Sequence, residues 1–212
     1  LDHHIKCGNA IVGLAHFKEL ENGIADEAFK TLPNDNKDIA ATFRNKNKAE
    51  RKTKGQLGIY DLTSAEHNLS EITGQFSQFD EMPEGTPEEI SAKAEAYKKL
   101  TTGKGWYRLK QLADIQVAQF FISKTEDNKE KLTTDAKYRT YLNSGAQIQD
   151  RGAAMARAAE KRFFHWFLEF PEVFSNGGFD CILGNPPFLG DRRLKESFGN
   201  NFLEWIRFHW LL

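Results

Sequence analysis

The sequence predicts an α/β protein, with part of a parallel β-sheet at the two ends of the chain and a large, mainly helical insertion between them. Near the C-terminal end, Phe179–Gly184 is a short apolar run bounded by glycines and prolines, which is typical of a buried strand. Near the start, Ile5 to Val12 is a second apolar stretch with turn residues at Gly8 and Asn9. Between them, apolar residues recur at helical spacings of three and four. We therefore predict core segments at 1–20 and 161–212, and a helical insertion at 21–160.

The composition is that of a soluble globular chain. Of its 212 residues, 40% are hydrophobic and 28% are charged, which argues against a disordered protein. No run approaches the roughly 18 apolar residues of a membrane span, so we expect no membrane partner. The formal net charge is −1, so a nucleic-acid surface requires local clustering of cations. Cys7 and Cys181 lack metal-ligand spacing, and we expect reduced thiols in a cytoplasmic protein.

Both ends of the chain are apolar. The chain begins at Leu1 without a methionine and stops within the apolar run 208–212. Because free termini are usually solvated, we expect an internal piece of a longer polypeptide, with the rest of that polypeptide as its first partner.

Helices are predicted along the whole insertion. Thr86, Pro87 and Glu89 combine an N-cap, a first-turn proline and a capping box, and predict a helix that continues to Leu100. Further helices are predicted over residues 57–79, 106–124, 134–143 and 147–170, the last ending at Pro171. The end of this last helix is rich in aromatic residues, which we interpret as core packing rather than as base-stacking platforms: Phe163, Phe164, Trp166, Phe167 and Phe170.

A basic cluster lies inside the insertion. It consists of Arg44, Lys46, Lys48, Arg51, Lys52 and Lys54. The cluster fits either a solvated helix face or loop, or a patch that contacts phosphates, since Lys and Arg supply the sequence-independent part of DNA affinity. Arg192 and Arg193 leave the same two interpretations open: a surface loop that pairs with Asp191 or Glu196, or a phosphate contact.

The motif Asn185-Pro186-Pro187-Phe188 follows the predicted strand directly. Ligands of open α/β sheets bind beyond the carboxyl ends of the strands, and paired prolines end a central strand. Methyl transfer to a planar amine suits this motif, because two acceptors aimed at the amine protons direct its lone pair toward the methyl donor. The Asn185 side-chain carbonyl and the Pro186 main-chain carbonyl can be those acceptors. Pro187 extends the rigid backbone, and Phe188 offers a ring for a flipped base, a contact of roughly 1–3 kcal/mol.

These residues carry a resemblance to a known family. The segment FDCILGNPPF, residues 179–188, resembles the motif after the fourth strand of class I, Rossmann-like methyltransferases that use S-adenosylmethionine. With Phe164-His165-Trp166, the run 170–174 and the start 4–13, the chain is similar to Eco57I-like, type IIG restriction-modification methylases. The resemblance implies a site-specific methyltransferase acting on adenine N6, with double-stranded DNA and restriction or specificity subunits as partners.

The resemblance also bears on the cofactor. It implies S-adenosylmethionine, with Asn9 at the position that approaches the adenine of the cofactor, where the family usually has Asp. It further implies a glycine-rich loop after the first strand, which this sequence lacks. We expect that loop to precede Leu1, and the chain alone to bind S-adenosylmethionine weakly or not at all and to be inactive.

Two alternatives remain open. Enzymes that methylate guanine N2 in RNA or a glutamine amide in protein share the four-residue motif, although they usually lack a long helical insertion. The chain can also be a DNA-binding or subunit-binding helical module without activity of its own, an interpretation that the basic cluster would support. Asp180 and Glu172 lack the Glu-X-Lys partner of a nuclease motif.

Overall fold

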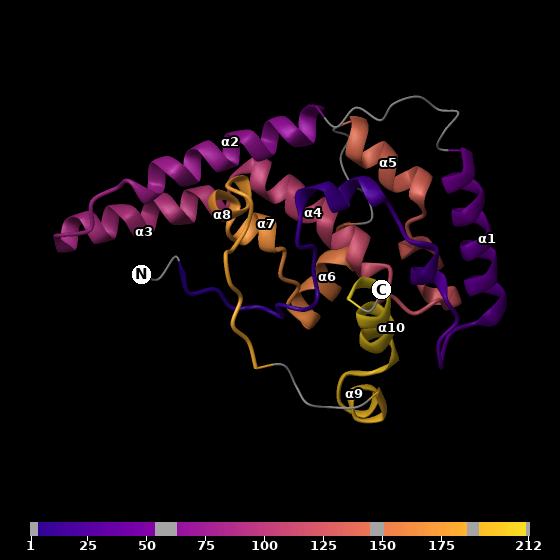
Figure 1. The fold of residues 1–212 in the computed structure, drawn as a ribbon. Helices are drawn as coiled ribbons and strands as arrows, with labels where there is room; N and C mark the ends of the chain where they lie inside the picture. Colours follow the sequence, from indigo (N-terminus) through magenta and orange to yellow (C-terminus); the bar gives the residue numbers. More distant parts are fainter. Residues whose placement is uncertain (1–3, 54–62, 145–150, 186–190, 211–212) are drawn as a thin grey trace.

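The computed structural model of the protein describes residues 4–53, 63–144, 151–185 and 191–210, and its described elements are helical (Figure 1). The 3₁₀ helices are η2 (Phe17–Asn22), η3 (Asp26–Phe29) and η4 (Glu126–Lys131). The α-helices are α1 (Lys37–Thr53), α2 (Thr63–Asp80), α3 (Pro87–Thr101), α4 (Lys104–Ala118), α5 (Asp135–Ser144), α6 (Arg151–Lys161), α7 (Trp166–Glu169), α8 (Pro171–Ser175), α9 (Asp191–Phe198) and α10 (Asn200–His209).

The predicted α/β fold with a partial Rossmann-like sheet is wrong, because the described residues contain no β-strand. The run 179–184 has no regular secondary structure, and Ile182 and Leu183 are 68% and 96% exposed. The N-terminal apolar stretch makes one isolated parallel bridge, between Asn9 and Phe163. A strand requires a neighbouring strand that pairs with its N–H and C=O groups. Within the described ranges the run 179–184 has no such neighbour, and the N-terminal stretch pairs with residues 162–166 without forming a strand.

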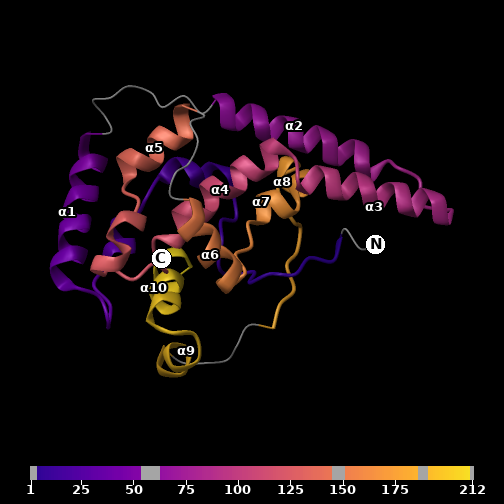
Figure 2. The ribbon, with the colours of Figure 1, turned by 180° about the vertical axis from the view of Figure 1, so that it is seen from behind.

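Helix α4 is the centre of the molecule. Helices α2, α3, α5, α6 and α7 all contact it, and Figures 1 and 2 show them arranged around it. Leu109, Leu112, Ile115 and Val117 of α4 are at most 1% exposed. This is the all-round burial expected of a helix inside a bundle.

Helices α2 and α3 form a hairpin that extends away from the rest of the molecule (Figures 1 and 2). The predicted capping box is confirmed: the Glu89 N–H donates to Thr86 Oγ1 (3.2 Å), and the Thr86 N–H donates to Glu89 Oε2 (3.0 Å). Phe76 and Phe79 of α2 contact the ring of Tyr97 of α3. The cap fixes where α3 begins, and the aromatic contacts join the two helices.

The predicted helix over 147–170 is broken in two. Helix α6 ends at Lys161, Arg162 has a left-handed φ of 54°, and α7 begins only at Trp166. The N–H groups of Phe164 and Trp166 donate to the carbonyls of Val12 and Leu14, both at 2.9 Å. Bonds to a distant segment therefore replace the helical bonds that periodicity predicts. The predicted helix over 106–124 also ends early, at Ala118.

The segment 9–14 is bonded on several sides. Its main chain pairs with residues 162–166, where the Asn9 N–H donates to Arg162 O at 2.7 Å. The indole N–H of Trp166 donates to Ala10 O (2.8 Å), and those of Trp205 and Trp210 donate to Ile11 O (2.8 and 3.0 Å). Three of the four tryptophans of the chain thus bind this segment. The segment joins the N-terminal residues to α7 and to α10.

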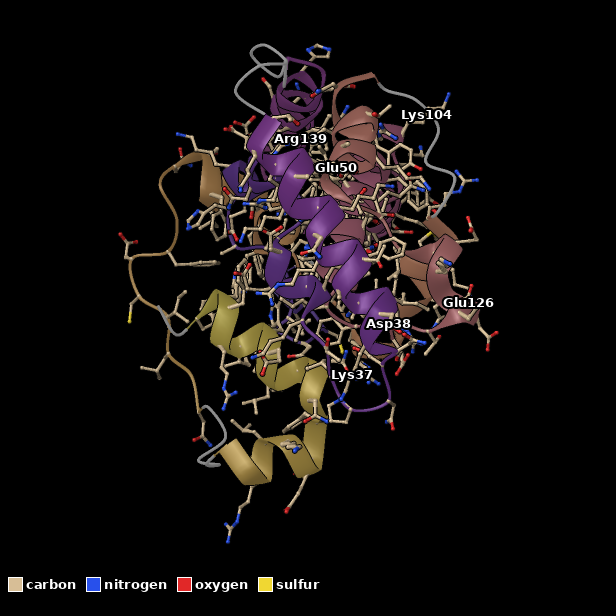
Figure 3. The ribbon with its side chains drawn as sticks, turned by 90° about the vertical axis from the view of Figure 1, so that its right-hand side faces the viewer. Lys37, Asp38, Glu50, Lys104, Glu126 and Arg139 are labelled. Carbon is tan, nitrogen blue, oxygen red and sulfur yellow. The ribbon has the colours of Figure 1, made fainter. Side chains whose placement is uncertain are left out.

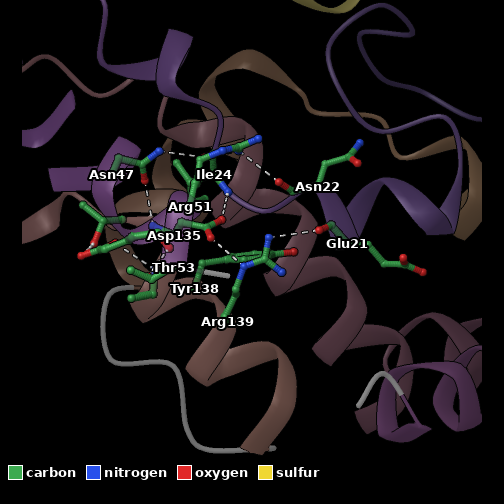
Figure 4. A network of polar contacts seen from close by, with 12 residues as sticks. Glu21, Asn22, Ile24, Asn47, Arg51, Thr53, Asp135, Tyr138 and Arg139 are labelled. Atoms are coloured by element: carbon green, nitrogen blue, oxygen red, sulfur yellow. Dashed lines mark hydrogen bonds and ion pairs between the residues drawn. The ribbon is translucent and has the colours of Figure 1, made fainter. Parts of the chain in front are cut away.

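A buried polar network joins α1 and α5 to the loop before η3 (Figure 4). Asp135 is 1% exposed; its Oδ1 accepts from the Ile24 N–H (3.0 Å) and its Oδ2 accepts from Arg139 Nε (2.6 Å). Asn47 of α1 accepts from the Asp135 N–H (2.8 Å) and donates to Ile24 O (2.9 Å). Gly23 lies so close that an added Cβ would meet Asp135 Oδ1 at 1.9 Å. These bonds satisfy polar groups that would otherwise be buried without partners.

The Asp135→Ala substitution tests this network. We expect the free energy of unfolding to fall by about 3–5 kcal/mol, because the substitution leaves the Arg139 guanidinium buried without its carboxylate. Urea denaturation followed by circular dichroism measures the change. The matched control is Asp127→Ala, at an exposed position, where we expect a change within about 0.5 kcal/mol. Equal losses for the two variants would contradict the role of the network.

Lys124 is a fully buried lysine. It is 0% exposed, and its Nζ donates to Gln119 O at 3.1 Å. Burial lowers the pKa of this ammonium from 10.5 to about 8, and the Asp35 carboxylate opposes part of that effect. The folded chain therefore releases this proton near pH 8, whereas the unfolded chain keeps it to about pH 10.5.

We expect the free energy of unfolding to rise between about pH 8 and 10.5, by up to about 3 kcal/mol, because the unfolded state then binds the extra proton. The Lys124→Met variant should lack this rise, and the exposed-site control Lys104→Met should keep it. Urea denaturation at a series of pH values gives the comparison. Parallel pH profiles for wild type and Lys124→Met would contradict the burial of a titrating amine.

Candidate functional site

Asn185 ends the exposed segment that follows α8. Its side chain is exposed, like those of residues 180–184 before it. Pro186, Pro187 and Phe188 lie outside the described residues, so the geometry of the predicted amine pocket is described only as far as Asn185. Helix α9 begins three residues after Phe188.

An open cavity of about 370 Å³ lies beside this segment. One side is formed by the N-terminal residues, including Lys6 and Gly8, and the other by Phe179 and residues 181–183. The rings of Phe164, Trp166 and Phe170 also line it. Figures 1 and 2 show the N-terminal segment crossing the chain after α8. The volume is within the range of small-molecule sites, about 300–1,000 Å³.

The aromatic residues of this region have two roles. Phe163, Phe164 and Phe167 are at most 8% exposed, which confirms their interpretation as core. Trp166 and Phe170 are only partly buried and face the cavity. Phe179 packs edge-on against both rings, with centroid distances of 5.8 Å and 5.3 Å. The spacing of these aromatic residues along the chain is the same in both groups, so the sequence pattern does not separate them.

Lys6 lies between rings and a carboxylate at one edge of the cavity. Its Nζ is 4.4 Å from the ring centroid of Tyr97 and 5.6 Å from that of Phe170, and it donates to the Tyr97 hydroxyl. Glu169 Oε2 lies 3.7 Å from the same nitrogen. The side chain of Lys6 is 7% exposed. These contacts attach the N-terminal segment to α3 and α7.

Half-buried Glu172 of α8 is the titratable group with a raised pKa in this region. Burial raises the pKa of its carboxyl, and the nearby Asp80 carboxylate adds to the rise. Its Oε2 is enclosed, with no hydrogen-bond partner in the described structure. No group of three His, Cys, Asp or Glu side chains suited to a metal occurs in the described ranges.

His165 fixes the main chain behind the cavity. Its Nδ1 accepts from the Leu14 N–H (3.1 Å), so its Nε2 carries the proton and donates to Asp114 Oδ1 (3.0 Å). Asp114 Oδ2 lies 2.6 Å from Lys110 Nζ. Both His165 and Asp114 are nearly fully buried. This chain of bonds holds residues 163–166 against residues 12–14. No sequence pattern predicts it, because His165, Asp114 and Leu14 lie far apart along the chain.

The predicted phosphate-contact residues separate into different environments. Arg44, Lys46, Lys48 and Lys52 are exposed on α1. Arg51 is half-buried, and its guanidinium donates to Asn22 O (3.1 Å) and Ile24 O (2.6 Å). Lys54 and the side chain of Arg192 lie outside the described residues, and Arg193 is exposed on α9. Figures 1 and 2 show α1 on the far side of the molecule from the segment that ends at Asn185.

Asn9 lies between two residues that line the cavity, Gly8 and Ala10. Asn9 is partly buried, and its main-chain N–H donates a hydrogen bond to Arg162 O.

Gly13 lies against the main chain of Phe164, where an added Cβ would meet the carbonyl oxygen at 1.9 Å. The glycine is therefore required for the close approach of the two segments.

The His165→Phe substitution tests the chain of bonds behind the cavity. An aromatic ring is kept at this position, but the Leu14 N–H and Asp114 Oδ1 lose their bonds to the imidazole, so we expect a loss of about 2–4 kcal/mol in the free energy of unfolding. His67→Phe is the control, since His67 is exposed on α2. Urea denaturation measures both. A His165→Phe variant as stable as the control would show that the bond chain contributes nothing.

The helices of the described structure do not meet the requirements of a membrane span in length and apolar composition.

Comparison with curated proteins and with solved structures found no match. A family model described as Eco57I restriction-modification methylase matches residues 15–207. This range includes α1 to α9, all but the last two residues of α10, the segment 179–185 and the motif at 185–188. The chain therefore belongs to the Eco57I restriction-modification methylase family.

Proposed function

We propose that the chain is part of a site-specific DNA methyltransferase that transfers a methyl group from S-adenosylmethionine to N6 of adenine, in a restriction-modification or phage-defence system. Membership of the methylase family is the observation that carries the proposal. The motif Asn185-Pro186-Pro187-Phe188, which lies within the matched range, supports the amine as acceptor. The proposal includes the rest of a longer polypeptide, and restriction or specificity subunits, as partners.

The proposed role of the motif is to hold the amine. The Asn185 side-chain carbonyl and the Pro186 main-chain carbonyl accept the two amine protons, which turns the nitrogen lone pair toward the methyl donor. Phe188 stacks against the base once it has left the duplex. Leu183, two residues before Asn185, lines the aromatic cavity. The cavity therefore supports a binding region for a planar ring on this side of the molecule. Asn185 binds and orients the amine, and it does not form a covalent bond.

The described residues do not by themselves fit S-adenosylmethionine. The cofactor carries a sulfonium cation and ribose hydroxyls, which call for carboxylate acceptors, and the cavity has Lys6 and His4 but no carboxylate among its described lining residues. The Asn9 N–H is bonded to Arg162 O and is not free to bind a ligand. We therefore propose that the cofactor is bound mainly by other parts of the intact protein.

Methyl transfer to duplex DNA by the intact protein tests the proposal, with wild type compared with Asn185→Ala. We expect the variant to lose roughly 10²–10³-fold in rate, the size of effect seen when one aligned hydrogen-bonding group is removed from an active site. S-adenosylmethionine binding, measured by calorimetry, should be retained. Asn176→Ala, a second exposed asparagine in the loop after α8, is the control and should keep its rate.

Full activity of Asn185→Ala would remove Asn185 from the amine pocket. A wild-type protein that methylates RNA or a protein amide, but not duplex DNA, would favour the compact N-methyltransferases as the nearer functional relatives. Duplex binding without any methyl transfer would favour a DNA-binding module.

A further inference from the structure

One face of α1 carries a row of exposed cations. With 3.6 residues per turn, Lys37, Arg44, Lys48 and Lys52 lie within about 80° of one another around the helix axis. All four side chains are exposed, and the row is about 22 Å long. We call these four residues the α1 stripe. Lys46 is also exposed but lies about 160° from Lys48, outside the stripe.

The carboxylates of α1 do not neutralise the stripe. Glu50 faces α5, where its Oε1 accepts from Thr134 Oγ1 (3.1 Å) and its Oε2 accepts from the Ala136 N–H (2.9 Å). Asp38 lies on the side of the helix next to the α1 stripe. Figure 3 shows α1 in front, with Lys37 and Asp38 at its start. Within the described part of the chain, no ion pair engages Arg44, Lys48 or Lys52.

The rigid attachment of α1 makes the stripe a fixed array. Asn47, on the inner side, and Arg51, about 20° from Arg44 around the helix axis, bind the main chain of residues 22–24. Ile39 and Ala40 of the same helix are also buried. The inner face therefore holds the helix, and the cations of the outer face are positioned without further ordering of the backbone.

Charge is separated along the molecule. Helix α1 has six cationic side chains and two carboxylates, while residues 63–101 of the α2–α3 hairpin have three lysines and eight carboxylates. The two elements lie at opposite ends of the molecule (Figures 1 and 2). A polyanion is attracted to the α1 end and repelled from the hairpin, so the field also selects an orientation.

We propose that the α1 stripe binds the phosphate backbone of duplex DNA without reading its sequence, and that this contact turns the acidic α2–α3 hairpin away from the duplex. The proposal rests on DNA as the substrate in the proposed function. The row covers about two thirds of one turn of B-DNA, which is about 34 Å long. Exposed Lys and Arg that neutralise phosphates release counterions, and this makes the affinity depend on salt.

The test measures the affinity of the intact protein for a duplex of about 20 base pairs by fluorescence anisotropy, over salt concentrations from about 50 to about 200 mM. The variant is Arg44→Gln/Lys48→Gln/Lys52→Gln. Each lost phosphate contact should lower the slope of log affinity against log salt by about 0.9, so the triple variant should lose about 2.7. Over this salt range, wild type should then lose about 40-fold more affinity than the variant.

The matched control is Lys98→Gln/Lys99→Gln/Lys104→Gln, which removes the same charge from exposed positions away from α1. It should change the slope by less than about 0.5. An unchanged slope in the α1 variant, or an equal change in the control, would overturn the proposal. Circular dichroism checks that both variants are folded. Methyl transfer is measured separately with Asn185→Ala, so failure of the stripe and failure of the methyltransferase assignment are distinguishable.

Discussion

The hydrogen-bonded segment 9–14 is the constraint on which the arrangement of the molecule depends. Residues 162–166 pair with its main chain, His165 and Trp166 bind it through side chains, and α10 reaches it through Trp205. Each bond contributes only about 1 kcal/mol, but together they connect residues more than 150 positions apart. Because of them the N-terminal residues and the chain after α8 form two sides of one cavity, next to Asn185.

Local sequence signals predicted a helix well where residues within or next to that helix determine its boundary. The capping box at Thr86 placed the start of α3 correctly, and the spacing of Leu109 and Leu112 placed them on the buried side of α4. Prediction failed where a long-range bond decided the outcome. The helical pattern of 147–170 continues through Arg162, but bonds to Val12 and Leu14 interrupt the helix. The predicted strand at 179–184 failed for the same reason, since strand formation depends on a partner that composition does not reveal.

The candidate site was predicted from chemistry rather than from geometry. Asn185 was singled out as an amide acceptor that follows an apolar run. The match over residues 15–207 establishes the family of the chain. His165 and Asp114 gave no signal, because a histidine and an aspartate far apart in sequence form a pair only through the fold. The basic cluster was predicted as one group, yet the fold turns Arg51 inward and leaves Arg44 and Lys48 on the outer face.

The central claim is that the intact protein methylates adenine N6 in DNA. The most direct measurement is nucleoside mass spectrometry, with sequencing of modified bases, on DNA from cells that carry the intact gene and from cells that lack it. The proposal predicts N6-methyladenine at one recurring sequence in the first DNA only. N4-methylcytosine at a recurring sequence, or DNA with no methylated base beside methylated RNA or protein amide, would contradict it.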